Sequence, residues 1–517
     1  MRSPNVANYL ENSVLAHPAK AALIFEEQGQ WTFREVDEAV NRIANGLVDL
    51  GVKRGDRVTL FLPNCAESIF WYFGTLKMGG IVNPLNPTLK QRELEYIIGD
   101  CEPTVIVTAK EVADEILKVF RQPGITARTM VLVDGDQDGC LTYEGWAGKH
   151  SPDFDAIPVD GDDLAAILYT SGTTGKPKGV MLTHANLWVN ARHCSDYAKT
   201  NYKDVGLCSL PLFHSYALTH VVGELWMEAA TIVWQKRFDA TKTFEAMVNL
   251  KVTCFYGVAT IYYALVNHPN VDDYAKRTTL RFCVTGAAVT PEPILKAWNE
   301  KFAPLCEGYG TTEASPVVSK NPYPGEGVQK PTSCGLPIVP EIEMRVVDNK
   351  DNPLSPGEVG ELVYRGPNIM KGYWRKPEAT AETLRNGWYH SGDLAYYDED
   401  GYFYIKDRLK DMICRAAFNI YPKEIEDLLY THPAVAEAQV VGIPDLVKGE
   451  EVVACIALKP GTTMSEQEAI EFCKANLATY KAPKYVRFYD ALPKTATGKL
   501  EKVTLRTELE KEFGKAY

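Results

Sequence analysis

Short apolar runs alternate with helix-like segments along the chain up to about residue 340, and this alternation restricts the fold more than any other feature. The runs Arg57–Phe61, Ala165–Thr170 and Leu280–Thr285 are bounded by turn residues, which is typical of strands buried on both faces of a sheet. Pro291 opens the helix-like segment Glu292–Phe302, because proline fits the first turn of a helix. The pattern predicts an α/β fold with helix-covered sheets.

The pattern changes twice toward the C-terminus. From about residue 341 strands become short and turns frequent, and residues 396–405 have the pattern of a β-hairpin. After residue 409 the predicted helices and strands suffice for a compact α+β domain of about one hundred residues. We therefore predict an α/β large N-terminal domain, residues 1–409, with two helix-covered sheets and a small β-barrel-like subdomain at 341–409. A small α+β C-terminal domain, residues 410–517, follows it.

Composition excludes several classes of function. The 517-residue chain has a net charge of -12 and a pI near 5.4, which argues against broad electrostatic binding to nucleic acid or anionic membranes. Its 12 cysteines are scattered singly, so neither a zinc site nor a disulfide framework is predicted. The N-terminus lacks the pattern of a signal peptide, and no run of about 18 apolar residues predicts a membrane span. We expect a cytoplasmic protein without a nucleic-acid partner.

The segment Tyr169–Gly179 lies between two apolar runs and is the strongest local signal. Its small residues let backbone N–H groups approach an anion closely, while hydroxyls add donors and lysines add charge. It is not a Walker A sequence, because Lys176 is followed by Pro177. A flexible linker has a similar composition, but a linker rarely interrupts two buried strands with this much basic charge. The predicted phosphate-binding residues are Thr170, Ser171, Gly172, Thr173, Thr174, Gly175 and Lys178.

Four further segments occur in a characteristic order after this one. They are Gly286-Ala287-Ala288, Gly308–Glu313, Ser391-Gly392-Asp393 with Arg408 downstream, and Pro493–Lys499. Through these motifs the chain resembles the adenylate-forming superfamily of acyl-CoA synthetases, nonribosomal-peptide adenylation domains and beetle luciferases. The resemblance extends nearly from end to end of the chain. It implies an AMP-forming acyl-CoA synthetase that uses ATP, Mg²⁺ and coenzyme A.

The resemblance also implies where the nucleotide binds. Tyr309 would pack on the adenine, Glu313 would hold Mg²⁺ with Thr170 as a second contact, and Asp393 would bond the ribose hydroxyls. Arg408 would reach the ribose and the phosphate. The other nucleotide-binding residues that it implies are Gly286, Ala287, Ala288, Glu307, Gly308, Gly310, Thr311, Thr312 and Ile405.

The resemblance assigns catalysis to positioning and charge neutralisation, because adenylation needs no covalent enzyme intermediate. The protonated Lys499 would bridge the acid's carboxylate and the α-phosphate as charge develops there. Lys410 would be the hinge about which the C-terminal domain rotates, so that Lys499 serves the first half-reaction and leaves for the second.

The coenzyme A site departs from the family in one respect. Many relatives carry two glycines where this chain has Ala416-Ala417, and the second position lines the tunnel for the pantetheine arm. The Cβ of Ala417 is therefore expected to narrow this tunnel without closing it. For the nucleotide end of coenzyme A, Tyr480 and Lys484 offer an aromatic face and a cation. An exposed basic turn explains those two residues equally well.

The acid itself is less constrained. The resemblance places the acyl pocket at Phe213–Tyr216 and Val258-Ala259, with His214 orienting the carboxylate or packing in an aromatic cluster. Amino-acid-activating relatives place an aspartate near the position of His214, and none occurs here. Leu218 corresponds roughly to a tryptophan that gates long alkyl chains in some relatives. We therefore expect a medium-chain, alicyclic or aromatic carboxylic acid.

Three alternatives share part of this pattern. A luciferase-like adenylating oxidase has every adenylation motif, and a ligase that loads a carrier protein has the same first step. A catalytically idle nucleotide-binding module is disfavoured because Lys499, Glu313 and Asp393 are all present. The assembly state is left open, with a homodimer as one expectation.

Overall fold

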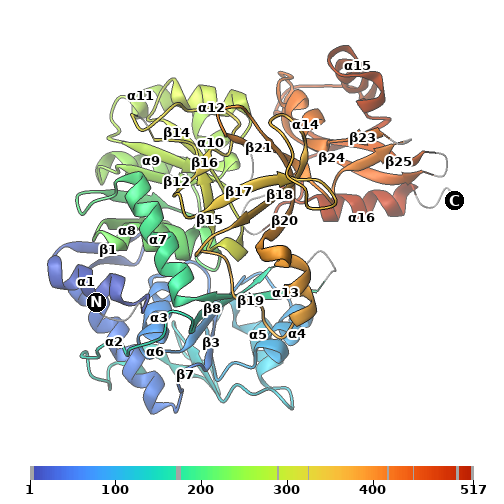
Figure 1. The fold of residues 1–517 in the computed structure, drawn as a ribbon. Coiled ribbons are helices and arrows are strands. Elements are labelled where there is room, and N and C mark those ends of the chain that lie inside the picture. Colours follow the sequence, from blue (N-terminus) through green and yellow to red (C-terminus); the bar gives the residue numbers. More distant parts are fainter. Residues whose placement is uncertain are drawn as a thin grey trace.

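The computed structural model describes residues 5–170, 176–287, 290–323, 325–415, 418–445, 448–495 and 500–513 (Figure 1). A large N-terminal body contains two sheets with helices around them, and a smaller sheet joins it to the C-terminal domain. Ser171, Gly172, Thr173, Thr174, Gly175, Ala288, Ala416, Ala417 and Lys499, for which we predict roles, lie outside the described residues.

The first large sheet carries the two glycine-containing motifs predicted to bind the nucleotide, Gly286-Ala287-Ala288 and Gly308–Glu313. Six neighbouring strands at its centre pair in parallel: β1, β11, β10, β12, β13 and β14. Antiparallel strands flank them, β2 at one edge and β15 and β16 at the other. In spatial order they are β16 (Leu336–Pro337), β15 (Val317–Lys320), β14 (Leu305–Gly310), β13 (Phe282–Thr285), β12 (Cys254–Gly257), β10 (Val205–Cys208), β11 (Thr231–Trp234), β1 (Ala21–Phe25) and β2 (Gly29–Thr32).

The second large sheet contains, as antiparallel neighbours, the strands that precede and follow the predicted phosphate-binding residues in the sequence, β8 and β9. In spatial order its strands are β19 (Gly372–Tyr373), β9 (Lys178–Thr183), β8 (Leu164–Thr170), β4 (Ile81–Leu85), β3 (Arg57–Phe61), β5 (Val105–Thr108), β6 (Thr129–Leu132) and β7 (Leu141–Thr142). The central pairs β4–β3, β3–β5 and β5–β6 are parallel and almost wholly buried, as expected of strands covered on both faces.

One continuous apolar core joins the two large sheets. The helices that pack in it between the sheets are α1 (Asn8–Ala16), α2 (Phe33–Asp49), α3 (Ala66–Lys77), α6 (Tyr143–Ala147), α7 (His184–Ala198), η2 (Tyr216–Val221) and α8 (Val222–Met227). Other helices cover outer faces: α4 (Gln91–Cys101), α5 (Ala113–Phe120), α9 (Ala240–Asn249), α10 (Ala259–Val266), α11 (Val271–Ala275) and α12 (Glu292–Asn299). This layering is the α/β architecture that the alternating pattern predicts.

The region predicted to be rich in β-structure forms an antiparallel sheet, ordered β17 (Glu343–Val347), β18 (Gly360–Arg365), β20 (Tyr389–Tyr397) and β21 (Phe403–Arg408). Its β20–β21 pairing confirms the predicted hairpin at 396–405. The short helix α13 (Pro377–Thr383) lies beside it.

The C-terminal domain has two apolar clusters of its own. Its strands are β23 (Phe418–Ile420), β22 (Ile413–Arg415), β25 (Gly449–Leu458), β24 (Val435–Asp445) and β26 (Tyr485–Tyr489), and its helices are α14 (Pro422–Tyr430), α15 (Glu466–Asn476) and α16 (Lys502–Phe513). Within the described ranges of the chain, no helix is both long enough and apolar enough to span a bilayer.

Two element boundaries show how well the period of apolar residues locates structure. The strand predicted at Arg57–Phe61 is β3 with the same bounds. The helix predicted at Glu292–Phe302 ends early, at Asn299, so that prediction was wrong in its last turn. The side chain of Asn299 accepts a 2.8 Å hydrogen bond from the backbone N–H of Leu305, which starts the next strand. This tertiary contact ends the helix where the apolar pattern alone would continue it.

Candidate active site

A cavity of about 640 Å³ lies where strand ends of both large sheets meet the small sheet. It is lined from one side by the ends of β8, β13 and β14, and from the other by residues of β20 and β21. Ligand sites of α/β proteins commonly occupy such positions at the carboxyl ends of strands. The predicted site residues that line it are Thr170, Lys178, His214, Gly286, Ala287, Gly308, Tyr309, Gly310, Thr311, Thr312, Glu313, Arg408 and Lys410.

The corner around Glu313 has the character of a phosphate and cation site. The Tyr373 hydroxyl donates a 2.9 Å hydrogen bond to one carboxylate oxygen of Glu313. The ammonium of Lys178 lies 4.9 Å from the centre of the Tyr373 ring, so a cation and an anion flank the same aromatic side chain. Thr170 pairs with Lys178 across β8 and β9 and brings its hydroxyl to the same cavity. Carboxylate and hydroxyl oxygens suit Mg²⁺, and these residues therefore fit the metal.

A second corner is built on Asp393, which is buried. The Tyr309 hydroxyl donates a 2.6 Å hydrogen bond to Oδ2 of Asp393, and Nε of Arg408 lies 3.1 Å from Oδ1. Asp393 faces Arg408 directly in the β20–β21 pairing. Asp393 raises the pKa of Arg408 above its usual value by attraction, although burial opposes this. Both carboxylate oxygens are thus engaged by protein groups, and ribose hydroxyls would join this arrangement.

The side of the cavity at which the acid is predicted to bind contains His214 and Gly286. The Nδ1 atom of His214 accepts a 3.1 Å hydrogen bond from the backbone N–H of Tyr216, so the neutral ring carries its proton on Nε2. A Cβ built on Gly286 would meet the Tyr216 ring at 3.6 Å, an ordinary contact, so the glycine keeps open space that belongs to the cavity. Ala287 has φ 65°, in the left-handed region that non-glycine residues rarely adopt.

Three predicted nucleotide-binding residues in the described part of the chain do not line the cavity: Asp393, which contacts the lining residues Tyr309 and Arg408, Glu307 and Ile405. Glu307 is buried, and its carboxylate accepts a 2.8 Å hydrogen bond from the backbone N–H of Thr332. Burial raises the pKa of Glu307 to about 8, although hydrogen bonds from backbone N–H groups oppose this shift. Ile405, on β21, packs at the edge of the main core.

Tyr480 and Lys484, predicted for the nucleotide end of coenzyme A, lie in the C-terminal domain and are not among the residues that line the cavity. Tyr480 stacks on Phe418 with ring centres 4.6 Å apart, and Nη1 of Arg415 donates to the carbonyl of Tyr480. The Lys484 ammonium lies 3.4 Å from a carboxylate oxygen of Asp445. Phe418 and Tyr480 are 52% and 39% exposed, so this aromatic pair offers a face to solvent beside cationic groups.

Sequence reasoning missed several residues of the cavity. Tyr373 lines it, and Tyr364 supports it from behind, with its hydroxyl 2.9 Å from that of the lining residue Thr311. Both come from a region that gave no local signal of a site. His220 and Lys320 also line the cavity. A signal was present for His220, a basic residue within the mostly apolar run 216–223, but not for Lys320, which stands between Ser319 and Asn321. Buried basic residues need partners, which the pattern alone does not supply.

Comparison with known proteins places the chain in a family. The model of the AMP-binding enzyme family matches residues 10–374, and that of the AMP-binding enzyme C-terminal domain matches residues 424–499. A long-chain-fatty-acid–CoA ligase of Bacillus subtilis (strain 168) is 36% identical over 523 residues, which cover 95% of this chain and 92% of the relative. A feruloyl-CoA synthase of Amycolatopsis sp is 36% identical over 485 residues, covering 93% of this chain and 94% of the relative.

Solved structures agree with the sequence matches. ATP-bound MatB from Rhodopseudomonas palustris superposes with a TM-score of 0.91 at 32% identity, over 99% of this chain and 100% of that one. An anthranilate CoA ligase in complex with anthranoyl-AMP gives a TM-score of 0.89 at 28% identity, over 98% and 97% of the two chains. The predicted fold, a large α/β domain followed by a small α+β domain, is thereby confirmed. The chain belongs to the AMP-binding enzymes of the adenylate-forming superfamily, and it is an acyl-CoA ligase of the AMP-forming type, a family whose substrates include ATP and coenzyme A.

Proposed function

We propose that this enzyme converts a medium-chain, alicyclic or aromatic carboxylic acid to its CoA thioester through an acyl-adenylate. One observation carries the proposal: a single cavity joins Glu313, and the Asp393 partners Tyr309 and Arg408, to the open space beside Gly286 and His214. The first group of residues suits a nucleotide. An acid bound in that space would face the α-phosphate of ATP. The names of the relatives refer to different acids, so the acid class rests on the pocket and on Leu218, which is a small, buried side chain here.

In the first half-reaction a carboxylate oxygen of the acid attacks the α-phosphorus, and the bond to pyrophosphate breaks. Lys178 and the hydroxyls of Thr311 and Thr312 would hold phosphate oxygens, so that the attacking and leaving groups lie in line. A Mg²⁺ ion held by Glu313 and Thr170 would neutralise phosphate charge. Lys499 would add a second positive charge between carboxylate and phosphate.

In the second half-reaction the thiol of coenzyme A attacks the carbonyl carbon of the adenylate, and AMP leaves. Rotation of domain 410–517 against domain 1–409 would remove Lys499 and bring the coenzyme A site to the cavity, with Lys410 as the hinge. Lys410 lines the cavity and lies in the short link between β21 and β22, a position suited to this role. Tyr480 and Lys484 would then bind the nucleotide end of coenzyme A. A cytoplasmic location and a homodimer belong to the same proposal.

The experiment is a panel of carboxylic acids tested for acid-dependent exchange of pyrophosphate into ATP, and for AMP release with coenzyme A present. We expect exchange with aromatic or medium-chain acids and thioester formation with free coenzyme A. Glu313→Gln should lower exchange by about a hundredfold, because a phosphate-bound cation loses its carboxylate. Transfer only to a phosphopantetheinylated carrier protein, or oxygen consumption with light, would identify a different second step. No exchange with any acid would refute the proposal.

A further inference from the structure

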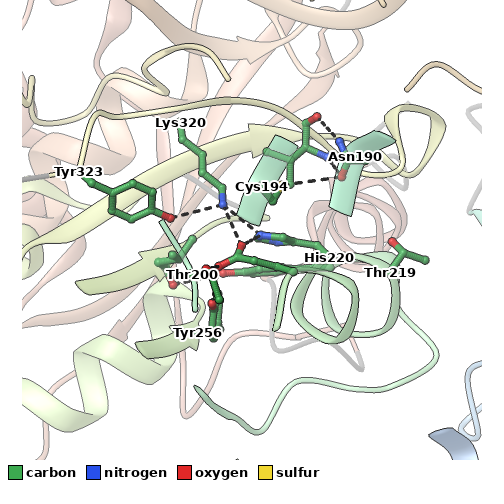
Figure 2. A network of polar contacts seen from close by, with 12 residues as sticks. Asn190, Cys194, Thr200, Thr219, His220, Tyr256, Lys320 and Tyr323 are labelled. Atoms are coloured by element: carbon green, nitrogen blue, oxygen red, sulfur yellow. Dashed lines mark hydrogen bonds and ion pairs between the residues drawn. The ribbon is translucent and has the colours of Figure 1, made fainter. Parts of the chain in front are cut away.

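A buried ionic network adjoins the cavity, which two of its members, His220 and Lys320, line. Figure 2 shows the contacts of this network. Its centre is the ammonium of Lys320, at the end of β15, with Glu224 on α8 and His220 on η2. All three side chains are at most 1% exposed. Burying charged groups is costly unless they are paired, and leaving one unpaired is strongly unfavourable. The network therefore needs an explanation beyond packing.

The contacts of the network pair both charges. The Lys320 ammonium lies 3.0 Å from Nε2 of His220, 3.4 Å from Oε2 of Glu224 and 3.4 Å from the hydroxyl of Tyr323. Glu224 also accepts hydrogen bonds from the hydroxyl of Tyr256, at 2.6 Å, and from that of Thr200, at 3.2 Å. The two charges thus offset each other, and the carboxylate is fully surrounded by donors (Figure 2).

The same place has the donor atoms of a metal site, but an ammonium takes the cation's role. Cys194, His220 and Glu224 bring one donor atom each within 4.8 Å of one another. Burial raises the pKa of the Cys194 thiol to about 12, so this ligand stays protonated at neutral pH. Lys320 already supplies the positive charge that Glu224 requires. A metal ion would add charge beside that ammonium, which disfavours it.

His220 is the member of the network with an unsatisfied group. Its Nε2 lies 2.8 Å from a Glu224 oxygen, which can only accept, and 3.0 Å from the Lys320 ammonium, which can only donate. Nε2 can either donate a hydrogen bond to Glu224 or accept one from Lys320, but not both. Because the contact to the carboxylate is the shorter one, we assign the ring proton to Nε2. Nδ1 then carries a lone pair. In the described part of the chain, this buried atom meets no hydrogen-bond partner.

The network is continuous with the acid side of the cavity. His220 and Lys320 line the cavity, whereas Glu224, Tyr256 and Thr200 lie behind them. The Tyr216 ring stacks on the His220 ring at 5.4 Å and 12°, and it is also the ring nearest to the open space at Gly286. The wall of the proposed acid pocket thus runs from Gly286 through Tyr216 to His220.

We propose that His220 and Lys320 select acids that carry a hydroxyl group on the acyl part, with the hydroxyl donating to Nδ1 of His220. This inference rests on the proposed function and names the substrate class of the same site. A site built to bond a hydroxyl discriminates strongly against an analogue that lacks it, because its own polar group stays unpaired. An alkyl end group would leave Nδ1 buried without a partner.

The charge of the network favours a neutral hydroxyl over a second carboxylate. Burial raises the pKa of Glu224, but Lys320, His220 and Tyr256 together lower it to about 2. Burial and Lys320 lower the pKa of His220 to about 4, although Glu224 opposes this, so the ring is neutral near pH 7. The network then holds one positive and one negative charge. A second carboxylate there would be an uncompensated buried anion.

The test compares pairs of acids in which a hydroxyl replaces a methyl group of similar size. Suitable pairs are para-hydroxybenzoate and para-methylbenzoate, para-hydroxycinnamate and para-methylcinnamate, and ω-hydroxyhexanoate and heptanoate. For at least one pair, we expect kcat/KM of pyrophosphate exchange to favour the hydroxyl acid by about tenfold or more. Dicarboxylates of the same lengths form a third arm.

Variants assign the preference to the network. His220→Gln keeps an N–H donor for Glu224 near the position of Nε2 but removes Nδ1, so the preference should fall to within about threefold. Thr200→Val is the matched control, because it disturbs Glu224 by removing one of its hydrogen bonds at a residue that does not line the cavity. The preference should persist in this variant. The double variant Lys320→Met/Glu224→Gln removes both charges together and provides a second test if His220→Gln fails to fold.

The outcomes separate failure of the hydroxyl preference from failure of the proposed function. Exchange with methyl acids at least as fast as with hydroxyl acids would overturn this inference but leave the proposed function intact. A preference for dicarboxylates, or a hydroxyl preference unchanged in His220→Gln, would also overturn it. The absence of exchange with every acid would instead refute the proposed function.

Discussion

At the scale of single residues, the site depends on contacts that hold ionised groups in place. Glu313 is fixed by Tyr373, and Asp393 by Tyr309 and Arg408. Such contacts orient the carboxylate that binds the metal or the nucleotide, although they do not themselves touch the reacting atoms. Two predictions follow from the surroundings of individual carboxyl groups.

Tyr373→Phe removes the 2.9 Å hydrogen bond to Glu313 but keeps the aromatic ring beside Lys178. We expect the Mg²⁺ concentration for half-maximal pyrophosphate exchange to rise about tenfold, as loss of an outer contact commonly weakens a metal site. Tyr397→Phe, which loses a hydrogen bond to the carbonyl of Leu354 away from the cavity, is the control. Equal effects of the two variants would contradict this role of Tyr373.

The buried carboxyl of Glu307 predicts a pH-dependent stability. Burial raises its pKa from 4.5 to about 8, so the folded protein keeps this proton where the unfolded chain has released it. Stability should therefore fall as pH rises through this window, by at most about 1.4 kcal/mol per pH unit. Glu307→Gln should remove this loss, seen as a gain over the wild type in urea unfolding at alkaline but not acidic pH. The exposed Glu300, changed to Gln, should leave the pH profile unchanged.

At the scale of elements, local pattern predicts type better than extent. The apolar run Arg57–Phe61 locates β3 with its bounds, because a strand covered on both faces buries nearly all of its residues. The apolar period overextends α12, whose end depends on Asn299 bonding the start of β14. The β20–β21 pairing brings Asp393 opposite Arg408, so the two parts of a motif separated along the chain meet through strand register.

Strands β22 and β23 stand on either side of Ala416-Ala417 in the sequence, the two residues predicted to affect the coenzyme A tunnel. Arg415 and Phe418 pair across the hairpin, with Ala416 and Ala417 between them. Ala417→Gly should widen the proposed tunnel, raising thioester formation about threefold or more while pyrophosphate exchange stays unchanged. Ala416→Gly is the matched control, since it adds similar backbone freedom one position away. Equal changes in both half-reactions would exclude a tunnel role for Ala417.

At the scale of the whole molecule, the two domains meet at the cavity through the short link between β21 and β22. Arg408 and Lys410 both line the cavity, so any rotation about this link changes the active site itself. If rotation separates the half-reactions, fixing the link should affect them unequally.

Lys410→Pro restricts the backbone of the proposed hinge, because the proline ring fixes φ. We expect acyl-CoA formation to fall about tenfold or more, with pyrophosphate exchange reduced far less. Lys410→Ala removes the same side chain but keeps the backbone free, so the rates of the two half-reactions should change by similar factors. Parallel losses in the proline variant, measured with the same acid, would argue against a hinge at this residue.

The sequence by itself determined the fold class, the order of the domains and the class of chemistry, because apolar period, turn residues and compact motifs act over short stretches of chain. It also pointed to Glu313 and Asp393, since each stands in a motif of a few residues. Only the tertiary structure decided which side chains hold them and which residues form the wall of the proposed acid pocket. Tyr373 reaches Glu313 across 60 positions, and Lys320 reaches Glu224 and His220 across 96 and 100. Contacts of that separation depend on the packing of sheets and helices, which no local pattern records.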